Sequence, residues 1–98
     1  MLEERNEYLV FISNLTGIPS DDIMGRSRHY PIARARQLLA WALRTLRGYT
    51  FMSIGVMMGI DYATVINHSK KINYHYQSDL IKEWMRQIER YKLKGGVR

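Results

Sequence analysis

Apolar residues recur three or four positions apart along most of the chain, the spacing that places them on one face of an α-helix. Glycine, proline and capping residues interrupt this spacing and divide the chain into segments. The predicted helices cover about residues 2–15, 20–24, 31–47, 51–58, 62–76 and 78–93. No segment alternates as a half-buried strand does. The pattern predicts one all-α domain of about six helices over residues 1–98, with a core over about 8–76 and a C-terminal packing helix over about 78–93.

The segment from residue 49 to 72 contains two short helical patterns separated by a tight turn. The Thr50 hydroxyl can cap the first helix by accepting from the backbone N–H of residues 52 and 53. That helix is apolar on most sides and is expected to be largely buried, through Phe51, Ile54, Val56, Met57 and Met58. Gly59 is expected in the left-handed region, and Asp61 is a good N-cap for the second helix.

The second helix of this segment has one apolar stripe and one polar face. The stripe consists of Val65, Ile66, Ser69 and Ile72, and the residues that fall largely outside it are Asn67, His68, Lys70 and Lys71. A short buried helix, a tight turn and a polar-faced helix are typical of a helix-turn-helix. An ordinary helical hairpin in a small bundle has the same pattern, so this segment alone leaves both interpretations open.

Positive charge is concentrated around this segment. The whole chain has a formal net charge of +6, but residues 26–75 alone carry +7, since they hold eight basic residues and one acid, Asp61. The basic residues are Arg26, Arg28, Arg34, Arg36, Arg44, Arg47, Lys70 and Lys71. A solvated surface normally interleaves acids with bases. The distribution therefore favours an anionic polymer as partner, most simply nucleic acid.

Six of these basic residues are arginines in and after a loop. Arg26 and Arg28 lie in a stretch without helical periodicity, and Pro31 suits the first turn of the long helix that follows. The arginines of that helix fall off its apolar stripe, so Arg34, Arg36, Arg44 and Arg47 are expected to project away from the core.

The sequence offers no catalytic or metal-binding pattern. It has no cysteine, and His68 and His75 are seven residues apart, whereas zinc ligands on one helix usually lie four apart. We expect the histidines at the surface or facing phosphate. Neither a phosphate-binding glycine loop nor a nucleophile elbow is present. We therefore expect no enzymatic activity, no cofactor and no small-molecule substrate.

Two further features concern location. No apolar run approaches the ~20 residues of a membrane span, and the N-terminus lacks the basic start and apolar core of a secretory signal. The expectation is a cytoplasmic protein that does not bind a membrane.

Several short motifs follow one another along the chain between residues 35 and 72. They are Ala35-Arg36-Gln37, Ile54-Gly55, Gly59, Asp61, Thr64-Val65 and Lys71-Ile72. In this spacing they resemble the C-terminal DNA-binding domain of the bacterial replication initiator DnaA, where A-R-Q is followed by I-G-x-x-F-G, R-D-H-[ST]-T-V and K-I. The resemblance covers roughly residues 8–76. It implies a helix-turn-helix that binds specific double-stranded DNA, as in replication-origin recognition, here without the family's ATPase part.

The resemblance also implies roles for residues that match the motifs. The helix starting at Asp61 would be the recognition helix in the major groove, with Thr64 and Lys71 at matching positions. Other candidate contacts on this helix are Asp61, Tyr62, Asn67, His68 and Lys70. Asn67 could pair bidentately with adenine if the helix turns it into the groove.

The remaining implied contacts lie before the helix-turn-helix. Arg26 and Arg28 occupy the loop whose arginines reach the neighbouring minor groove in the family. Arg36 and Gln37 match the A-R-Q element, where contact with backbone phosphate is expected.

The turn departs from the family's pattern. Where the family has G-G-R-D-H-T-T-V, one glycine is missing here, and Ile60, Tyr62 and Ala63 replace the arginine, the histidine and the first threonine. Isoleucine and alanine offer no side-chain hydrogen bond, and tyrosine carries no charge. We therefore expect a preferred DNA site that differs from the family's box, with weaker discrimination.

Two other functions remain open. The same replacements favour a helical protein-interaction domain that kept the fold and lost specific DNA binding. Binding of structured RNA through the basic face is a third possibility. Double-stranded DNA is the leading hypothesis for the partner, and a monomer is expected for the isolated domain.

Overall fold

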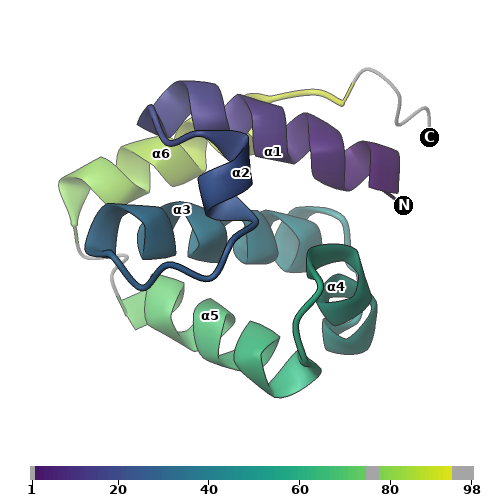
Figure 1. The fold of residues 1–98 in the computed structure, drawn as a ribbon. Helices are drawn as coiled ribbons and strands as arrows, with labels where there is room; N and C mark the ends of the chain where they lie inside the picture. Colours follow the sequence, from purple (N-terminus) through teal and green to yellow (C-terminus); the bar gives the residue numbers. More distant parts are fainter. Residues whose placement is uncertain (1, 75–77, 94–98) are drawn as a thin grey trace.

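Helix α3 (Tyr30–Trp41) runs through the middle of the molecule, and the other helices pack around it (Figure 1). The computed structural model describes residues 2–74 and 78–93. Pro31 lies in the first turn of α3, where its missing N–H costs no hydrogen bond. Residues 35 and 38–43 are buried, so the middle of the chain forms the centre of the core.

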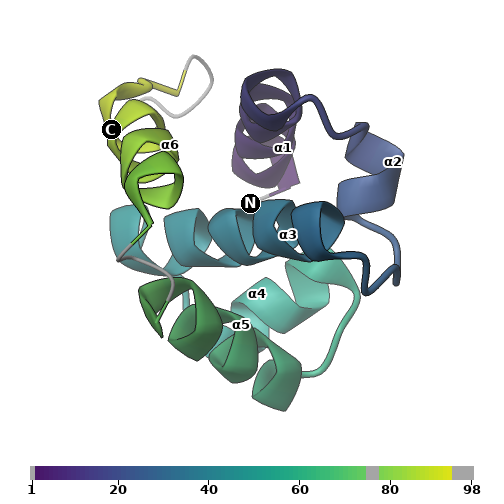
Figure 2. The ribbon, with the colours of Figure 1, turned by 90° about the vertical axis from the view of Figure 1, so that its left-hand side faces the viewer.

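Two layers lie on opposite sides of α3. Helices α1 (Leu2–Thr16) and α6 (Asp79–Arg90) lie on one side, and α4 (Phe51–Met58) and α5 (Tyr62–Tyr74) on the other (Figure 2). The short helix α2 (Ser20–Ile23) joins α1 to the loop before α3. Fully buried side chains from the six α-helices and from residue 43, which follows α3, form the core: Ile12, Ile23, Leu38, Leu39, Leu43, Ile54, Met57, Val65, Ile72 and Ile88.

A buried polar cluster fastens α1 to the end of the central helix. Glu4 is only 6% exposed and accepts a hydrogen bond from Arg47 Nη2 at 2.7 Å and another from the Tyr49 hydroxyl. The sequence predicted that Arg47 projects away from the core. This prediction is wrong, because Arg47 forms an ion pair with the Glu4 carboxylate of α1.

The predicted helix-turn-helix is present as α4 and α5. The Thr50 hydroxyl accepts from the backbone N–H of Ser53 at 3.0 Å, which confirms the N-cap of α4. Gly59 ends α4 with φ 71° and ψ 31°, the left-handed conformation that glycine adopts without strain. The turn is tight: the backbone N–H of Ile60 donates to the Gly55 carbonyl at 2.9 Å. The all-α class is confirmed, with six α-helices and no strand among the described residues.

Some predicted boundaries need correction. The long helix changes character at Ala42, where α3 continues into the π-helical segment η1 (Ala42–Leu46) before Gly48 ends it. Helix α6 ends at Arg90, so residues 91–93 do not belong to it. Helix α5 is described as far as Tyr74. Its predicted end at about residue 76, together with His75, lies outside the described residues.

Candidate nucleic-acid interface

The second helix of the motif begins at a well-formed cap. Asp61 Oδ1 accepts from the backbone N–H of Thr64 at 2.8 Å, as predicted for an N-cap. This hydrogen bond lowers the pKa of the Asp61 carboxyl, so the group is ionised at neutral pH. The negative charge lies at the positive end of the helix dipole, where it stabilises the start of α5.

Helix α5 buries one face and exposes the opposite one. Val65 and Ile72 are fully buried against α3 and α4, whereas Asn67, Lys70 and Lys71 are exposed. These three polar side chains make no hydrogen bond or ion pair with another described residue. The exposed face of α5 can therefore contact a partner without first breaking internal contacts.

The arginine loop, residues 24–29, lies beside this face. It follows α2 and contains Arg26 and Arg28, both exposed and neither paired with a carboxylate among the described residues. The side chain of Ser27 accepts from the backbone N–H of His29 at 3.1 Å, which folds the loop back on itself before α3 begins. Two cationic side chains are thus presented close to the start of the central helix.

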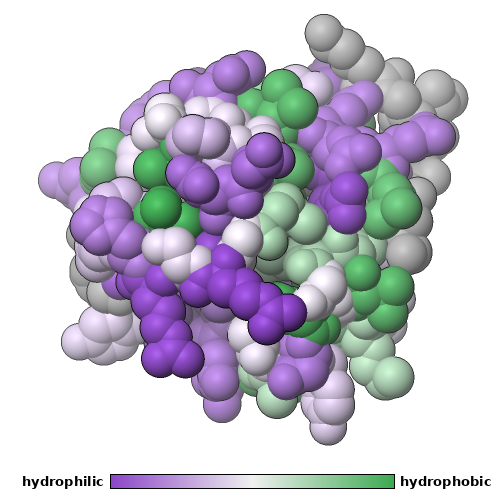
Figure 3. All heavy atoms as spheres, viewed as in Figure 1, coloured by the Kyte–Doolittle hydropathy of each residue, from purple (hydrophilic) through white to green (hydrophobic). Residues whose placement is uncertain are grey.

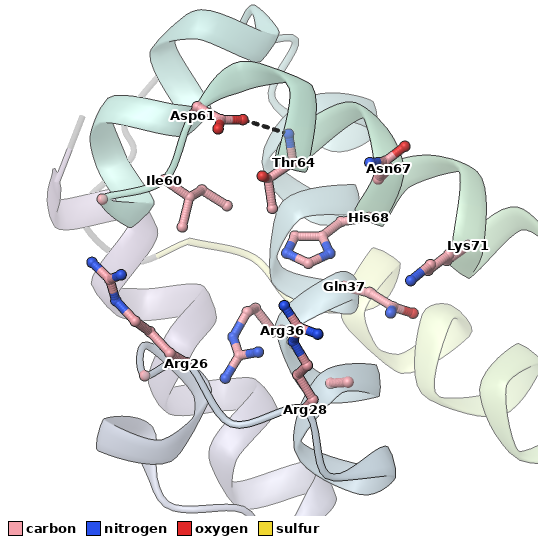
Figure 4. A pocket seen from close by; sticks show the side chains of 13 residues that line it. Arg26, Arg28, Arg36, Gln37, Ile60, Asp61, Thr64, Asn67, His68 and Lys71 are labelled. Carbon is pink, nitrogen blue, oxygen red and sulfur yellow. Dashed lines mark hydrogen bonds between the residues drawn. The ribbon is translucent and has the colours of Figure 1, made fainter.

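A hollow of about 730 Å³ separates the arginine loop from α5 (Figure 4). Arg26 and Arg28 line it from the loop, and Asp61 lies at the opposite edge, where α5 begins. Nine of the eleven residues predicted to contact DNA line this hollow: Arg26, Arg28, Arg36, Gln37, Asp61, Thr64, Asn67, His68 and Lys71. Tyr62 and Lys70 lie outside it. The structure thus brings together segments that are more than 30 residues apart in the sequence.

The A-R-Q residues lie deeper than the sequence suggested. Gln37 is 3% exposed, and its Oε1 accepts from Arg34 Nη1 at 2.5 Å. Arg36 is 7% exposed and donates three hydrogen bonds to backbone carbonyl oxygens. Arg34 is also buried and lies over the Tyr30 ring. The expectation that Arg34 and Arg36 project away from the core is therefore wrong, because α2, the loop and Tyr30 cover this face of α3.

Comparison with protein families identifies the fold. The family model described as the bacterial DnaA protein helix-turn-helix matches residues 9–72, well over half of the chain. The chain belongs to this family. A comparison with individual curated proteins finds no match.

Membership of the DnaA helix-turn-helix family indicates DNA binding and links the fold to replication. The family's domain is itself non-catalytic. The matched range includes α4 and all but the last two residues of α5, the two helices of the predicted helix-turn-helix.

The turn of this DnaA-family domain differs from the pattern in a way that the structure explains. Ile60 is half-buried and packs against the core, so it closes the turn where the family has a charged arginine. Tyr62 and Ala63 are exposed on the first turn of α5. The replacement at position 60 is thus a packing change, whereas those at 62 and 63 alter the surface.

His68, predicted to lie at the surface or to face phosphate, is partly exposed and lines the hollow. Its ring points toward the hollow from α5, and its Nε2 is buried without a hydrogen-bond partner among the described residues (Figure 4). Burial lowers the pKa of His68 to about 4, and the positive charges of Arg36 and Lys71 contribute to the shift. The imidazole is therefore neutral at pH 7 and adds no charge to the interface.

An apolar area borders the interface on the other side of the turn. Met52, Val56 and Tyr62 are 70%, 74% and 55% exposed, and they line a shallow hollow of about 470 Å³ with residues of the turn. The expectation that Val56 is buried is wrong, because one face of α4 is turned to solvent. Figure 3 shows hydrophobic side chains over α4 and strongly hydrophilic ones over the arginine loop. Hydrophobic periodicity alone gave no signal for this exposure.

Two other kinds of site are not seen in the described residues. No group of three or more His, Asp or Glu side chains within residues 2–74 and 78–93 could hold a metal ion. Over the same ranges, no helix is both long enough and apolar enough to cross a membrane.

Proposed function

We propose that this domain binds double-stranded DNA with sequence preference, as a monomer, placing α5 in the major groove and the arginine loop in the neighbouring minor groove. One observation carries the proposal: two exposed, unpaired arginines and the exposed polar face of α5 border the same hollow. Recognition helices read base edges in the major groove, while neighbouring cationic arms fix the register.

The proposed base contacts come from the exposed part of α5. Thr64, Asn67 and Lys71 line the hollow, and Tyr62 and Lys70 lie next to it on the same helix. Asn67 is the candidate for adenine, because its side-chain NH2 group can donate to adenine N7 while its oxygen accepts from the adenine N6 amino group. Lysine at 70 and 71 is suited to phosphate as a compact charge.

The target is proposed to differ from the family's origin box. In this chain the polar side chains of the family's turn are replaced by Ile60, Tyr62 and Ala63, which removes two possible polar contacts with bases or phosphates. Each good bidentate base contact contributes ~1–3 kcal/mol of discrimination. We thus propose that the domain recognises DNA resembling a replication origin, but that its preferred DNA sequence differs from the family's box and that it discriminates less strongly between sequences.

The experiment is a selection from random-sequence duplexes, followed by salt titration of the selected site. Enrichment of one motif, with tighter binding than shuffled duplex at equal salt, is expected. Lys71→Ala should weaken binding of that site, whereas Arg90→Ala, which removes one exposed charge from α6, should not. Binding without any enriched motif would reduce the function to polyanion binding, and absence of binding would contradict the proposal.

The second candidate is a protein-interaction domain, favoured by the exposed side chains of Met52, Val56 and Tyr62. Contiguous exposed apolar side chains are a feature of protein-binding surfaces. Absence of duplex binding in the selection would support this candidate, provided the protein is folded under the conditions used.

A further inference from the structure

Arg36 has an unusual set of partners for a residue at a proposed phosphate contact. Its Nε donates to the Ile23 carbonyl at 2.8 Å, its Nη1 to the Ser27 carbonyl at 2.7 Å and its Nη2 to the Asp22 carbonyl at 3.0 Å. The side chain extends from α3, and only 7% of the residue is exposed. All three nitrogens of the planar guanidinium are therefore committed to one short stretch of backbone.

These hydrogen bonds join α3 to two other parts of the chain, the end of α2 and the arginine loop. Asp22 and Ile23 lie at the end of α2, and the Asp22 carbonyl also accepts from the backbone N–H of Gly25 at 3.1 Å. Ser27 lies between Arg26 and Arg28, so the third bond holds the peptide that carries both loop arginines. The backbone hydrogen bonds of the loop lie at its two ends, from the N–H groups of Met24 and Gly25 to α2 and from the N–H of Ala33 to the His29 carbonyl.

The partners also leave the positive charge of Arg36 in place. Carbonyl oxygens accept hydrogen bonds without neutralising a guanidinium, unlike the carboxylate that binds Arg47. Arg36 can therefore contribute to the potential of the hollow while its geometry is determined by the loop.

We propose that Arg36 is a positioning residue for DNA binding: it holds the loop so that Arg26 and Arg28 face the groove, and it does not itself bind phosphate. This proposal rests on the proposed function. It assigns to the arginine of the A-R-Q element a role that the matching motif alone did not suggest.

Arg36→Lys tests the proposal, because lysine keeps the positive charge but cannot make the three hydrogen bonds that the planar guanidinium donates. If Arg36 acted only as a positive charge facing a phosphate, R36K would retain most of the affinity for the duplex. We expect instead that R36K weakens duplex binding by roughly tenfold, the scale of losing well-placed arginine contacts. Arg47→Lys is the matched control: it alters a forked arginine held by Glu4 of α1, and duplex affinity should not change.

A double-mutant cycle separates positioning from direct contact. R36K is measured in the wild type and in the R26A/R28A background, at a salt concentration low enough for every variant to bind measurably. If Arg36 acts through the loop, R36K should have little further effect once both loop arginines are gone. An equal loss in both backgrounds would overturn the proposal.

Limited trypsin digestion reports on the loop without DNA. R36K should be cleaved faster after Arg26 and Arg28 than the wild type, while R47K should not, with circular dichroism used to verify that each is folded. Unchanged cleavage in folded R36K would overturn the positioning role even if the wild type binds DNA. Failure of the wild type to bind any duplex would instead remove the proposed function, and the positioning role with it.

A second variant covers the case in which R36K does not fold. Insertion of two glycines after Ser27 loosens the loop and leaves Arg36 in place. We expect an affinity loss similar to that of R26A/R28A. Retained affinity in the folded insertion variant would show that loop geometry does not matter for binding and would contradict the proposal.

Discussion

Folding lowers the pKa of His68. An imidazole in an unfolded chain titrates near its ordinary pKa of 6.5, whereas burial in the fold lowers the pKa to about 4. The unfolded state therefore binds a proton more readily between these values. Stability contributed by the neutral ring is complete above about pH 6.5 and is lost as the pH falls toward 4.

The resulting prediction concerns pH and a single substitution. The thermal midpoint of the wild type should fall from pH 7.5 to pH 4.5, and His68→Gln should show a smaller fall, because it removes the group that must stay neutral. His29→Gln, in the exposed loop, should keep the wild-type dependence. Thermal melts at both pH values measure this. The same fall in wild type and His68→Gln would contradict the assignment.

The helix pair α4–α5 depends on how closely its two helices approach at the turn. Gly55 lies in α4, and a Cβ added there would be 2.6 Å from the Ile60 carbonyl oxygen. That oxygen belongs to the backbone and can move only if the turn moves. The spacing of the two helices, and with it the position of the exposed face of α5, thus requires glycine at position 55.

Gly55→Ala should therefore destabilise the domain, although alanine is the better helix former by ~1 kcal/mol. Overpacking of this kind costs about 1–3 kcal/mol, and denaturant titration measures the difference. Val56→Ala is the matched control, since its side chain is 74% exposed on the same helix, and it should change stability by less than about 0.5 kcal/mol. Equal or greater stability of Gly55→Ala would show that the turn adjusts freely.

A second prediction at this scale concerns the first turn of α5. Restoring the family's residues with I60R, Y62H and A63T should raise affinity for the family's box more than for random DNA. Because Tyr62 and Ala63 are exposed and Ile60 packs on the core, Y62H/A63T alone should produce much of the gain without the stability loss expected of I60R.

The measured quantity is the ratio of the two dissociation constants at fixed salt, for the wild type, the double and the triple variant. A wild type that already prefers the family's box by several orders of magnitude would contradict our interpretation of these replacements. A folded triple variant with an unchanged ratio would indicate that α5 is not the recognition helix.

Fewer basic side chains are exposed and unpaired in the folded protein than the number of basic residues in the central segment suggests. Arg34 and Arg36 are buried, and Arg47 is paired with Glu4. Arg44 lies over the Phe51 ring and donates to the Tyr49 carbonyl at 3.1 Å. Among the described residues, Arg26, Arg28 and Lys71 are exposed, unpaired cations that line the hollow, and Lys70 is exposed next to Lys71 on α5.

Binding should nevertheless depend strongly on salt. If about four to six phosphates are neutralised, the logarithm of the affinity should fall with the logarithm of salt concentration at a slope of roughly −4 to −5. R26A/R28A should make the slope shallower by about 2, one for each cation, with little change in the thermal midpoint. A flat salt response would rule out the electrostatic interpretation.

Sequence patterns alone determined the number of helices and several of their caps. Thr50, Gly59 and Asp61 were assigned as caps and occupy those positions, because capping depends on hydrogen bonds within one or two turns. Apolar spacing placed Val65 and Ile72 correctly in the core, since the periodicity of a helix fixes which side chains share a face. The family motifs then identified the helix-turn-helix.

Only the tertiary structure decided whether certain arginine, histidine and valine side chains face the core or the solvent. Arg36 turns inward to carbonyls of α2 and the loop, the Nε2 atom of His68 is buried, and Val56 faces solvent although it is apolar. The π-helical turn at residues 42–46 likewise has no signature in the apolar spacing. Local signals act over a turn or two of helix, whereas burial of these side chains depends on segments distant in sequence that meet only when the chain folds.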